Sequence, residues 1–181
     1  MIRFYRSGKE DIGSLVGLRA EMLREVNSLP EDHEFTASFI RDTESFFLTG
    51  DQTTILADDN GIIACATICY YDLLPTWDHP FGKRAHIMNV YTKPSARRQG
   101  IAMTMLELLI DEAKEKGVTS ITLDAAENAE KLYAGLGFEK TGEHMELNVL
   151  RLLRDKINHT GIYADGGPHK CCCGRNNAPK G

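Results

Sequence analysis

The sequence predicts an α/β (α+β) domain in which short apolar strands alternate with amphipathic helices. Three observations support this class. An apolar run at residues 86–91 leads through a glycine-containing turn into a helical pattern. Two further apolar runs, 53–57 and 62–70, are joined by Asp-Asn-Gly at 59–61, a strong hairpin signal. Residues 145–149 alternate between apolar and polar side chains, as a half-buried strand does.

The N-terminal third of the chain adds one strand and two helices. Residues 2–6 form a short strand candidate, and apolar side chains then recur at helical spacing from Asp11, a candidate N-cap, to Val26. The Leu-Pro-Glu-Asp segment at 29–32 ends this helix. A second helical pattern runs to residues 49–50 and places several phenylalanines on one side.

The C-terminal half continues the alternation. Residues 71–82, with two prolines and a tryptophan, are expected to form a loop. The helix after the glycine-containing turn has its stop signals at residues 114–117. A short strand at 121–123 follows, and then a helix that carries Tyr133 and ends at Gly137, a suitable C′ residue.

Composition limits the class of protein. At 181 residues, with 42% hydrophobic and 26% charged side chains, the chain suits one globular domain with appendages. No apolar run approaches the roughly 20 residues that span a bilayer, and a net charge of -5 gives no reason to expect nucleic acid. Cys65 and Cys69 lie too far apart on one strand to form a disulfide. We therefore expect a cytoplasmic protein with no membrane or nucleic-acid partner.

The turn at residues 97–102, Arg-Arg-Gln-Gly-Ile-Ala, is the most informative segment. The free N–H groups in the first turn of a helix, together with the helix dipole, favour an anion such as a phosphate. Gly100 lets the main chain approach the ligand, and the small Ala102 leaves room beside it. Arg97 and Arg98 add positive charge, although arginines at a turn are commonly just solvated.

Residues 89–102, NVYTKPSARRQGIA, resemble the acetyl-CoA-binding motif of the GNAT superfamily of N-acetyltransferases. Residues 129–138, AEKLYAGLGF, resemble that family's second signature, a helix with a tyrosine that closes in Leu-Gly-Phe. The resemblance covers residues 1–149. It implies a mixed twisted sheet of about six to seven strands with helices on both faces, in the order β-α-α-β-β-β-α-β-α-β.

The resemblance also implies an activity: an amine attacks the thioester of acetyl-CoA directly, in a ternary complex. Tyr133 is then the expected general acid for the departing thiolate, because a tyrosine pKa near 10 lies only about 1.5 units above that of a thiol. The alternative for Tyr133 is an aromatic core residue. His86 is the candidate base, with an inert sheet histidine as its alternative. Glu21 and Glu25 are substitutes for the base or can bind a cationic substrate. The first two helices and the segment 71–82 are expected to shape the substrate site.

The coenzyme contacts are carried over from the same resemblance. The strand end at Val90, Tyr91 and Thr92 is expected to pair with the pantetheine arm as an extra strand would. Asn128 can hydrogen-bond that arm or cap a helix. The remaining expected contacts lie in the turn and are Arg97, Arg98, Gln99, Gly100, Ile101 and Ala102.

The C-terminal segment differs from the rest. Residues 150–159 can form a short amphipathic helix that docks on the domain or on a second subunit, which leaves a homodimer open, and 160–181 read as a flexible tail. The three consecutive cysteines at 171–173 diverge in direction, so we expect no metal site.

Three functional hypotheses follow. The first is an N-acetyltransferase that acts on the primary amine of a small molecule or peptide. The second is a silent acyl-CoA-binding sensor. In the third, the C-terminal segment is a redox or metal module on an inert carrier.

Overall fold

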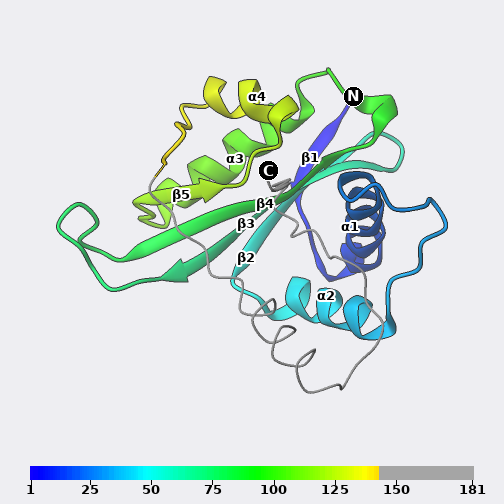
Figure 1. Cartoon of the computed structure of the whole chain (residues 1–181), viewed down its shortest axis with the longest axis horizontal. Helices are drawn as coiled ribbons and strands as arrows, with labels where there is room; N and C mark the ends of the chain where they lie inside the picture. Colours follow the sequence, from blue (N-terminus) through cyan, green and yellow to red (C-terminus); the bar gives the residue numbers. More distant parts are fainter. Residues whose placement is uncertain (143–181) are drawn as a thin grey trace, which may run out of the picture.

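A five-stranded sheet forms the centre of the computed structural model, which describes residues 1–142 (Figure 1). The strands follow the sheet order β1-β2-β3-β4-β5, and all neighbours are antiparallel except β4 and β5, which are parallel. Their bounds are β1 Arg3–Arg6, β2 Gln52–Asp58, β3 Ile62–Asp72, β4 Lys83–Thr92 and β5 Ser120–Leu123. The sheet is therefore mixed, as predicted.

Four helices cover the sheet, two on each face (Figure 1). The helices α1 and α2 pack on one face, and α3 and α4 on the other. Their bounds are α1 Ile12–Val26, α2 Ala37–Thr49, α3 Ile101–Glu115 and α4 Glu130–Gly135, with short 3-10 turns at η1 Lys9–Asp11, η2 Pro94–Ala96 and η3 Glu127–Ala129. The predicted order of elements is confirmed through α4. The expected strand at 145–149, helix at 150–159 and tail from 160 lie outside the described residues.

Each face of the sheet buries its own core, because successive strand side chains point to opposite faces. Leu56 and Cys65 pack with α1 and α2, while their neighbours Ile55 and Ala66 pack with α3. Met105 of α3 is fully buried in the second of these cores. Because each face carries a core, five consecutive residues are buried in β2 and five in β3.

A buried carboxylate ties α3 to the other elements. Glu112 accepts hydrogen bonds from Thr53 Oγ1 at 2.6 Å and from the Tyr70 hydroxyl at 3.0 Å. It also forms ion pairs with Arg6 of β1 and, at 3.5 Å, with Lys116. The Glu112 side chain is only 12% exposed, so charge-assisted bonds from four partners offset the cost of its burial.

The hairpin between β3 and β4 projects from the body of the molecule (Figure 1). Its strands reach Asp72 and begin at Lys83, so residues 71–72 and 83–85 are paired strand rather than loop. Gly82 has φ 65°, and a Cβ there would lie 2.2 Å from the carbonyl oxygen of Leu73. Only glycine fits this turn. Within the part of the chain that the structure describes, no helix is both long and apolar enough to cross a membrane.

Candidate functional site

A β-bulge interrupts β4 at Asn89, at the centre of the sheet. Thr67 of β3 pairs with Met88 and Cys65 pairs with Tyr91, so two β4 residues oppose one β3 residue. Asn89 has φ 54°, a left-handed conformation that asparagine tolerates better than most residues. As a result Met88 and Asn89 both line the same cavity, on the α1/α2 side.

Side chains from two other elements hold this bulge. The Cys65 thiol donates to the backbone carbonyl of Asn89 over 3.4 Å, and Asn89 Nδ2 lies 3.6 Å from the same sulfur. Arg19 of α1 donates from Nη1 to Asn89 Oδ1 over 3.3 Å. Burial raises the pKa of the Cys65 thiol to about 12, so it remains protonated and able to donate.

The strands β4 and β5 separate just before the bulge. Their parallel pairing runs from Arg84 with Ser120 to Ile87 with Leu123, and β4 then continues alone on that side to Thr92. Within residues 1–142 no strand pairs with this edge of β4 after Ile87. This stretch of β4 includes all three expected pantetheine-binding residues, Val90, Tyr91 and Thr92.

The turn after β4 presents free backbone donors. Arg98 and Gly100 have φ 65° and 78°, and a Cβ at Gly100 would meet no atom within 4 Å. Among the described residues, none accepts a hydrogen bond from the backbone N–H groups of residues 98–103, at the start of α3. Consecutive free N–H groups beside a helix N-terminus form an anion-binding concavity.

Arg97 holds this turn against α1. Its Nη2 atom lies 2.8 and 2.6 Å from the two carboxylate oxygens of Glu25, and its Nε donates to the carbonyl of Thr92 over 2.8 Å. The Arg97 side chain is therefore engaged in bonds within the protein, while the side chain of Arg98 is exposed. Glu25, an alternative for the base, is occupied as the partner of Arg97.

Tyr133 lies in the core between α4 and the sheet. Its side chain is buried, and its ring packs edge-on against Phe138 with centroids 6.0 Å apart. No described residue hydrogen-bonds its hydroxyl. The hydroxyl oxygen is nevertheless not fully buried. Burial raises the pKa of Tyr133. The predicted C′ residue Gly137 is confirmed, with φ 87°.

His86 lies on the opposite face of the sheet from Tyr133. Its neighbours Ala85 and Ile87 belong to the core that contains Tyr133, so His86 points to the α1/α2 side, as Met88 does. His86 Nδ1 is 2.9 Å from Thr122 Oγ1, and Nε2 is 3.9 Å from Asp124 Oδ2. Nδ1 thus faces β5, and Nε2 faces the residue that follows β5.

Asn128 lies in η3, and its side chain is exposed. The N-cap of η3 is Ala126 and that of α4 is Ala129, so Asn128 caps neither helix. The capping alternative is wrong. Contact with a coenzyme stays a prediction for this residue.

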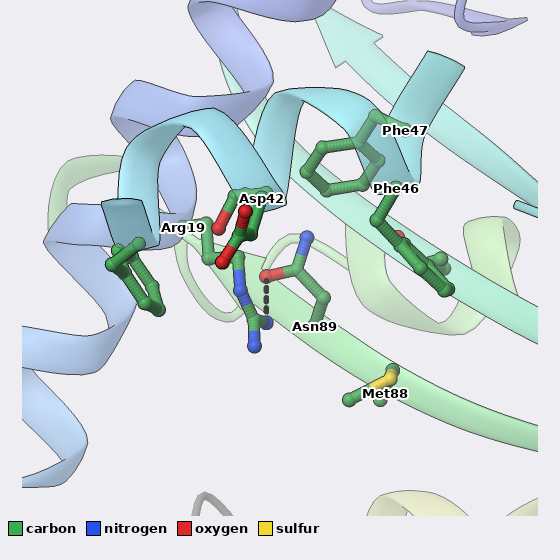
Figure 2. Close-up of a pocket in the computed structure, with 9 residues that line it drawn as sticks. Arg19, Asp42, Phe46, Phe47, Met88 and Asn89 are labelled. Atoms are coloured by element: carbon green, nitrogen blue, oxygen red, sulfur yellow. Dashed lines mark hydrogen bonds between the residues drawn. The ribbon is translucent and has the colours of Figure 1, made fainter. Parts of the chain in front are cut away.

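A cavity of about 300 Å³ lies between α1, α2 and the strands β3 and β4 (Figure 2). The first two helices line it, whereas the segment 71–82, expected beside the substrate, contributes no residue.

Comparison with known proteins identifies the family. The model of the acetyltransferase (GNAT) family matches residues 15–138. The chain belongs to the GNAT family. A predicted acetyltransferase from Clostridium acetobutylicum, whose crystal structure contains acetyl-CoA, is 31% identical with a TM-score of 0.74. The similarity covers 83% of this GNAT chain and 98% of that one.

Two other relatives define the limits of the similarity. A GCN5-related N-acetyltransferase from Ralstonia eutropha JMP134 has a TM-score of 0.69 at 21% identity, over 82% of this chain and 99% of that one, which shows a shared fold. N-acetyltransferase 8F1 of Rattus norvegicus is 27% identical over 124 residues, or 66% of this GNAT chain and 51% of the rat protein. The match thus spans about half the length of this rat protein. It spans 37% of N-acetyltransferase family 8 member 5 of Mus musculus and 38% of N-acetyltransferase 8B of Rattus norvegicus.

Sequence reasoning missed the bulge and the residues that hold it. In the sequence, Asn89 is one residue of the acetyl-CoA-binding motif, Cys65 is one of two cysteines on a strand, and no local pattern singles out Arg19. One signal was present, because asparagine inside an apolar strand is unusual and tolerates positive φ.

Proposed function

We propose that this GNAT acetyltransferase transfers the acetyl group of acetyl-CoA to a primary amine of a small molecule or peptide by direct attack. The observation that carries the proposal is a row of backbone N–H groups at residues 98–103 that have no acceptor among residues 1–142. They come directly after a strand whose edge, within the same residues, has no partner strand beyond Ile87. The acetyl-CoA bound by the Clostridium relative supports the choice of donor. Acetyl-CoA supplies an activated thioester: the N–C bond forms as the C–S bond breaks, and a neutral amine gives up one proton as sulfur gains one.

The residues present fit this coenzyme. The backbone amides from Arg98 onward would hold the diphosphate, and Gly100 leaves open space where a side chain would stand. The free edge at Val90 and Tyr91 would pair with the amides of the pantetheine arm. Part of the hydrogen-bonding capacity of Thr92 is already used, because its carbonyl accepts from Arg97. Asn128 is exposed and available for the same arm.

Tyr133 is the proposed acid. Because burial raises its pKa, the hydroxyl is fully protonated at neutral pH, as a proton donor must be. The same shift widens the pKa gap to a thiol, so the transfer depends on a close approach of the hydroxyl to sulfur. A hydroxyl without a partner among the described residues is free to make that contact.

His86 is the proposed base, from the other side of the sheet. It lies two residues before Met88 on the face that carries the cavity, about 7 Å along the strand. Thr122 orients the ring through Nδ1, and Asp124 lies near Nε2. Because Tyr133 and His86 lie on opposite faces of the sheet, they can address one ligand only where β4 and β5 separate. His86 is one residue before the last pair, Ile87 with Leu123, and Tyr133 belongs to the same core as Ile87.

A screen tests the proposal. The protein is incubated with acetyl-CoA and a panel of primary amines, and released thiol is compared with acetylated product by mass spectrometry. We expect one thiol for each acetylated amine. Binding of acetyl-CoA by calorimetry, without acetylation of any amine, would instead identify a sensor and overturn the proposal.

A further inference from the structure

The cavity next to the bulge combines an aromatic wall with one half-buried cation. Its apolar lining residues are Phe39, Phe46, Phe47 and Met88, of which Phe46, Phe47 and Met88 are labelled in Figure 2. Its volume of about 300 Å³ is at the small end of the roughly 300–1,000 Å³ typical of ligand sites. Such a cavity suits one small molecule with an apolar group.

The cation is Arg19. Its guanidinium approaches the neutral side chain of Asn89 (Figure 2), and no carboxylate of residues 1–142 lies within 4.0 Å of it. An arginine has five N–H donors in a planar fork that matches a carboxylate. One long contact with an amide oxygen leaves most of these donors for a ligand.

Asp42 is the other charged residue of the cavity, and it does not cancel the positive charge of Arg19 for a ligand. It belongs to α2, its side chain is exposed, and it forms no ion pair with Arg19. The field of an exposed carboxylate is weakened by water and salt, whereas that of a half-buried guanidinium is weakened less. The inner part of the cavity therefore favours an anion.

We infer that this cavity binds the acceptor, and that the acceptor is a small α-amino acid with an apolar side chain. The inference rests on the proposed function. Arg19 contacts the bulge residue Asn89, next to the strand edge proposed for the thioester arm, so a carboxylate on Arg19 lies close to the reacting amine. A compound with adjacent amino and carboxylate groups satisfies both positions, and its side chain then extends along the phenylalanines.

The reaction balances for this acceptor. The ammonium form of the amino acid loses one proton to solvent through the base, and the neutral amine forms the N–C bond to the acyl carbon. The C–S bond breaks, and the second amine proton ends on the departing sulfur. The products are an N-acetyl amino acid and a free thiol.

Matched acceptors test the inference. With acetyl-CoA present, kcat/KM is measured for phenylalanine and for phenylalaninamide, which differ only in the carboxylate. We expect phenylalanine to be favoured at least tenfold by the parent chain. The amide has the less basic amine and thus more of the reactive neutral form at pH 7, so this difference works against the expected result.

Variants assign the preference to Arg19. Arg19→Met should bring the ratio of the two kcat/KM values close to one, and Arg19→Lys should keep most of the preference. Arg41→Met, which removes an exposed charge of α2, should leave the ratio unchanged. Because the two kcat/KM values are compared within one variant, a general loss of activity from a distorted bulge lowers both and leaves their ratio unchanged. If Arg19→Met does not fold, the inference is tested by the ratio in the parent, expected to be at least tenfold, and by the ratio in Arg19→Lys, expected to keep most of that preference.

The outcomes are distinct. A parent chain that acetylates the amide as well as the acid overturns the inference, as does an Arg19→Met variant that keeps the tenfold ratio. Acetylation of other amines with no carboxylate preference leaves the proposed function intact. Failure to acetylate any amine overturns both.

Discussion

The Cys65 thiol donates a hydrogen bond to the backbone carbonyl of Asn89 over 3.4 Å, and through it β3 holds the bulge of β4. Asn89 returns a contact from Nδ2 to the same sulfur and accepts from Arg19. Both Cys65 and Asn89 are buried. The bulge is thus fixed from a neighbouring strand and from a helix, next to the place where β4 and β5 separate.

Substitution at Asn89 separates backbone strain from side-chain contacts. Asn89→Ala loses the bonds to Arg19 and Cys65 and keeps φ at 54°, so it should lower the free energy of unfolding by about 2 kcal/mol. Asn89→Gly loses the same bonds without the strain and should recover about 1 kcal/mol. Urea denaturation measures both. A glycine variant that is less stable than the alanine variant would contradict this account.

Cys65 should resist alkylation. With a pKa of about 12, only about one Cys65 side chain in 10⁴ is a thiolate at pH 8, and the thiolate is the nucleophile. Peptide mapping after iodoacetamide treatment should show Cys65 unmodified in the native protein and modified in urea, with the half-buried Cys69 reacting first of the two. Equal rates at Cys65 in native and unfolded protein would refute its burial.

Gly100 and Gly117 provide a matched pair at the two ends of α3. Both have positive φ, 78° and 73°, and a Cβ at either would meet no atom within 4 Å. Alanine at each should cost a similar stability, about 1 kcal/mol. Only Gly100→Ala should weaken the binding of acetyl-CoA, at least tenfold by calorimetry, because the added methyl group lies among the proposed diphosphate donors. Equal affinities in the two variants would show that the turn at Gly100 does not bind the diphosphate.

Glu112 should make stability depend on pH. Burial alone would raise the pKa of Glu112, but hydrogen bonds from Thr53 and Tyr70 and the charges of Arg6 and Lys116 lower it below the ordinary 4.5. Because the folded pKa is lower, the stabilisation is complete above about pH 4.5 and is lost as the pH falls through the folded value.

The variant Glu112→Gln isolates this effect. At pH 7 it should lower the free energy of unfolding by about 1–2 kcal/mol, and its difference from the parent should shrink as the pH falls through the lowered pKa of Glu112. Glu107→Gln, on an exposed position of the same helix, should change stability by less than about 0.5 kcal/mol at either pH. A difference for Glu112→Gln that does not change with pH would show that its charge is irrelevant.

Local signals explain why much of the fold was predictable. The hairpin turn at 59–61 and the glycines at 100 and 137 depend on conformations that glycine or asparagine adopts, so their residue types reveal them. Strand ends were less clear. Lys83 and Arg84 look like loop residues by polarity, yet both pair with β3.

Contacts between distant residues were beyond local patterns. Glu25 and Arg97 are 72 residues apart, and nothing in either segment indicates that they form an ion pair. The packing of Arg19 against Asn89 likewise depends on where α1 crosses the sheet. The motif turn could therefore be located from sequence, whereas the cavity beside it required the structure.

The kcat of Tyr133→Phe, with the Kd for acetyl-CoA measured in parallel, tests the central claim most directly. Tyr71→Phe, which removes a hydroxyl from the exposed part of the β3–β4 hairpin, is the control. If Tyr133 protonates the departing sulfur, kcat should fall at least about 100-fold while the Kd changes less than about twofold. A Tyr133→Phe variant that turns over as fast as the parent would contradict the account.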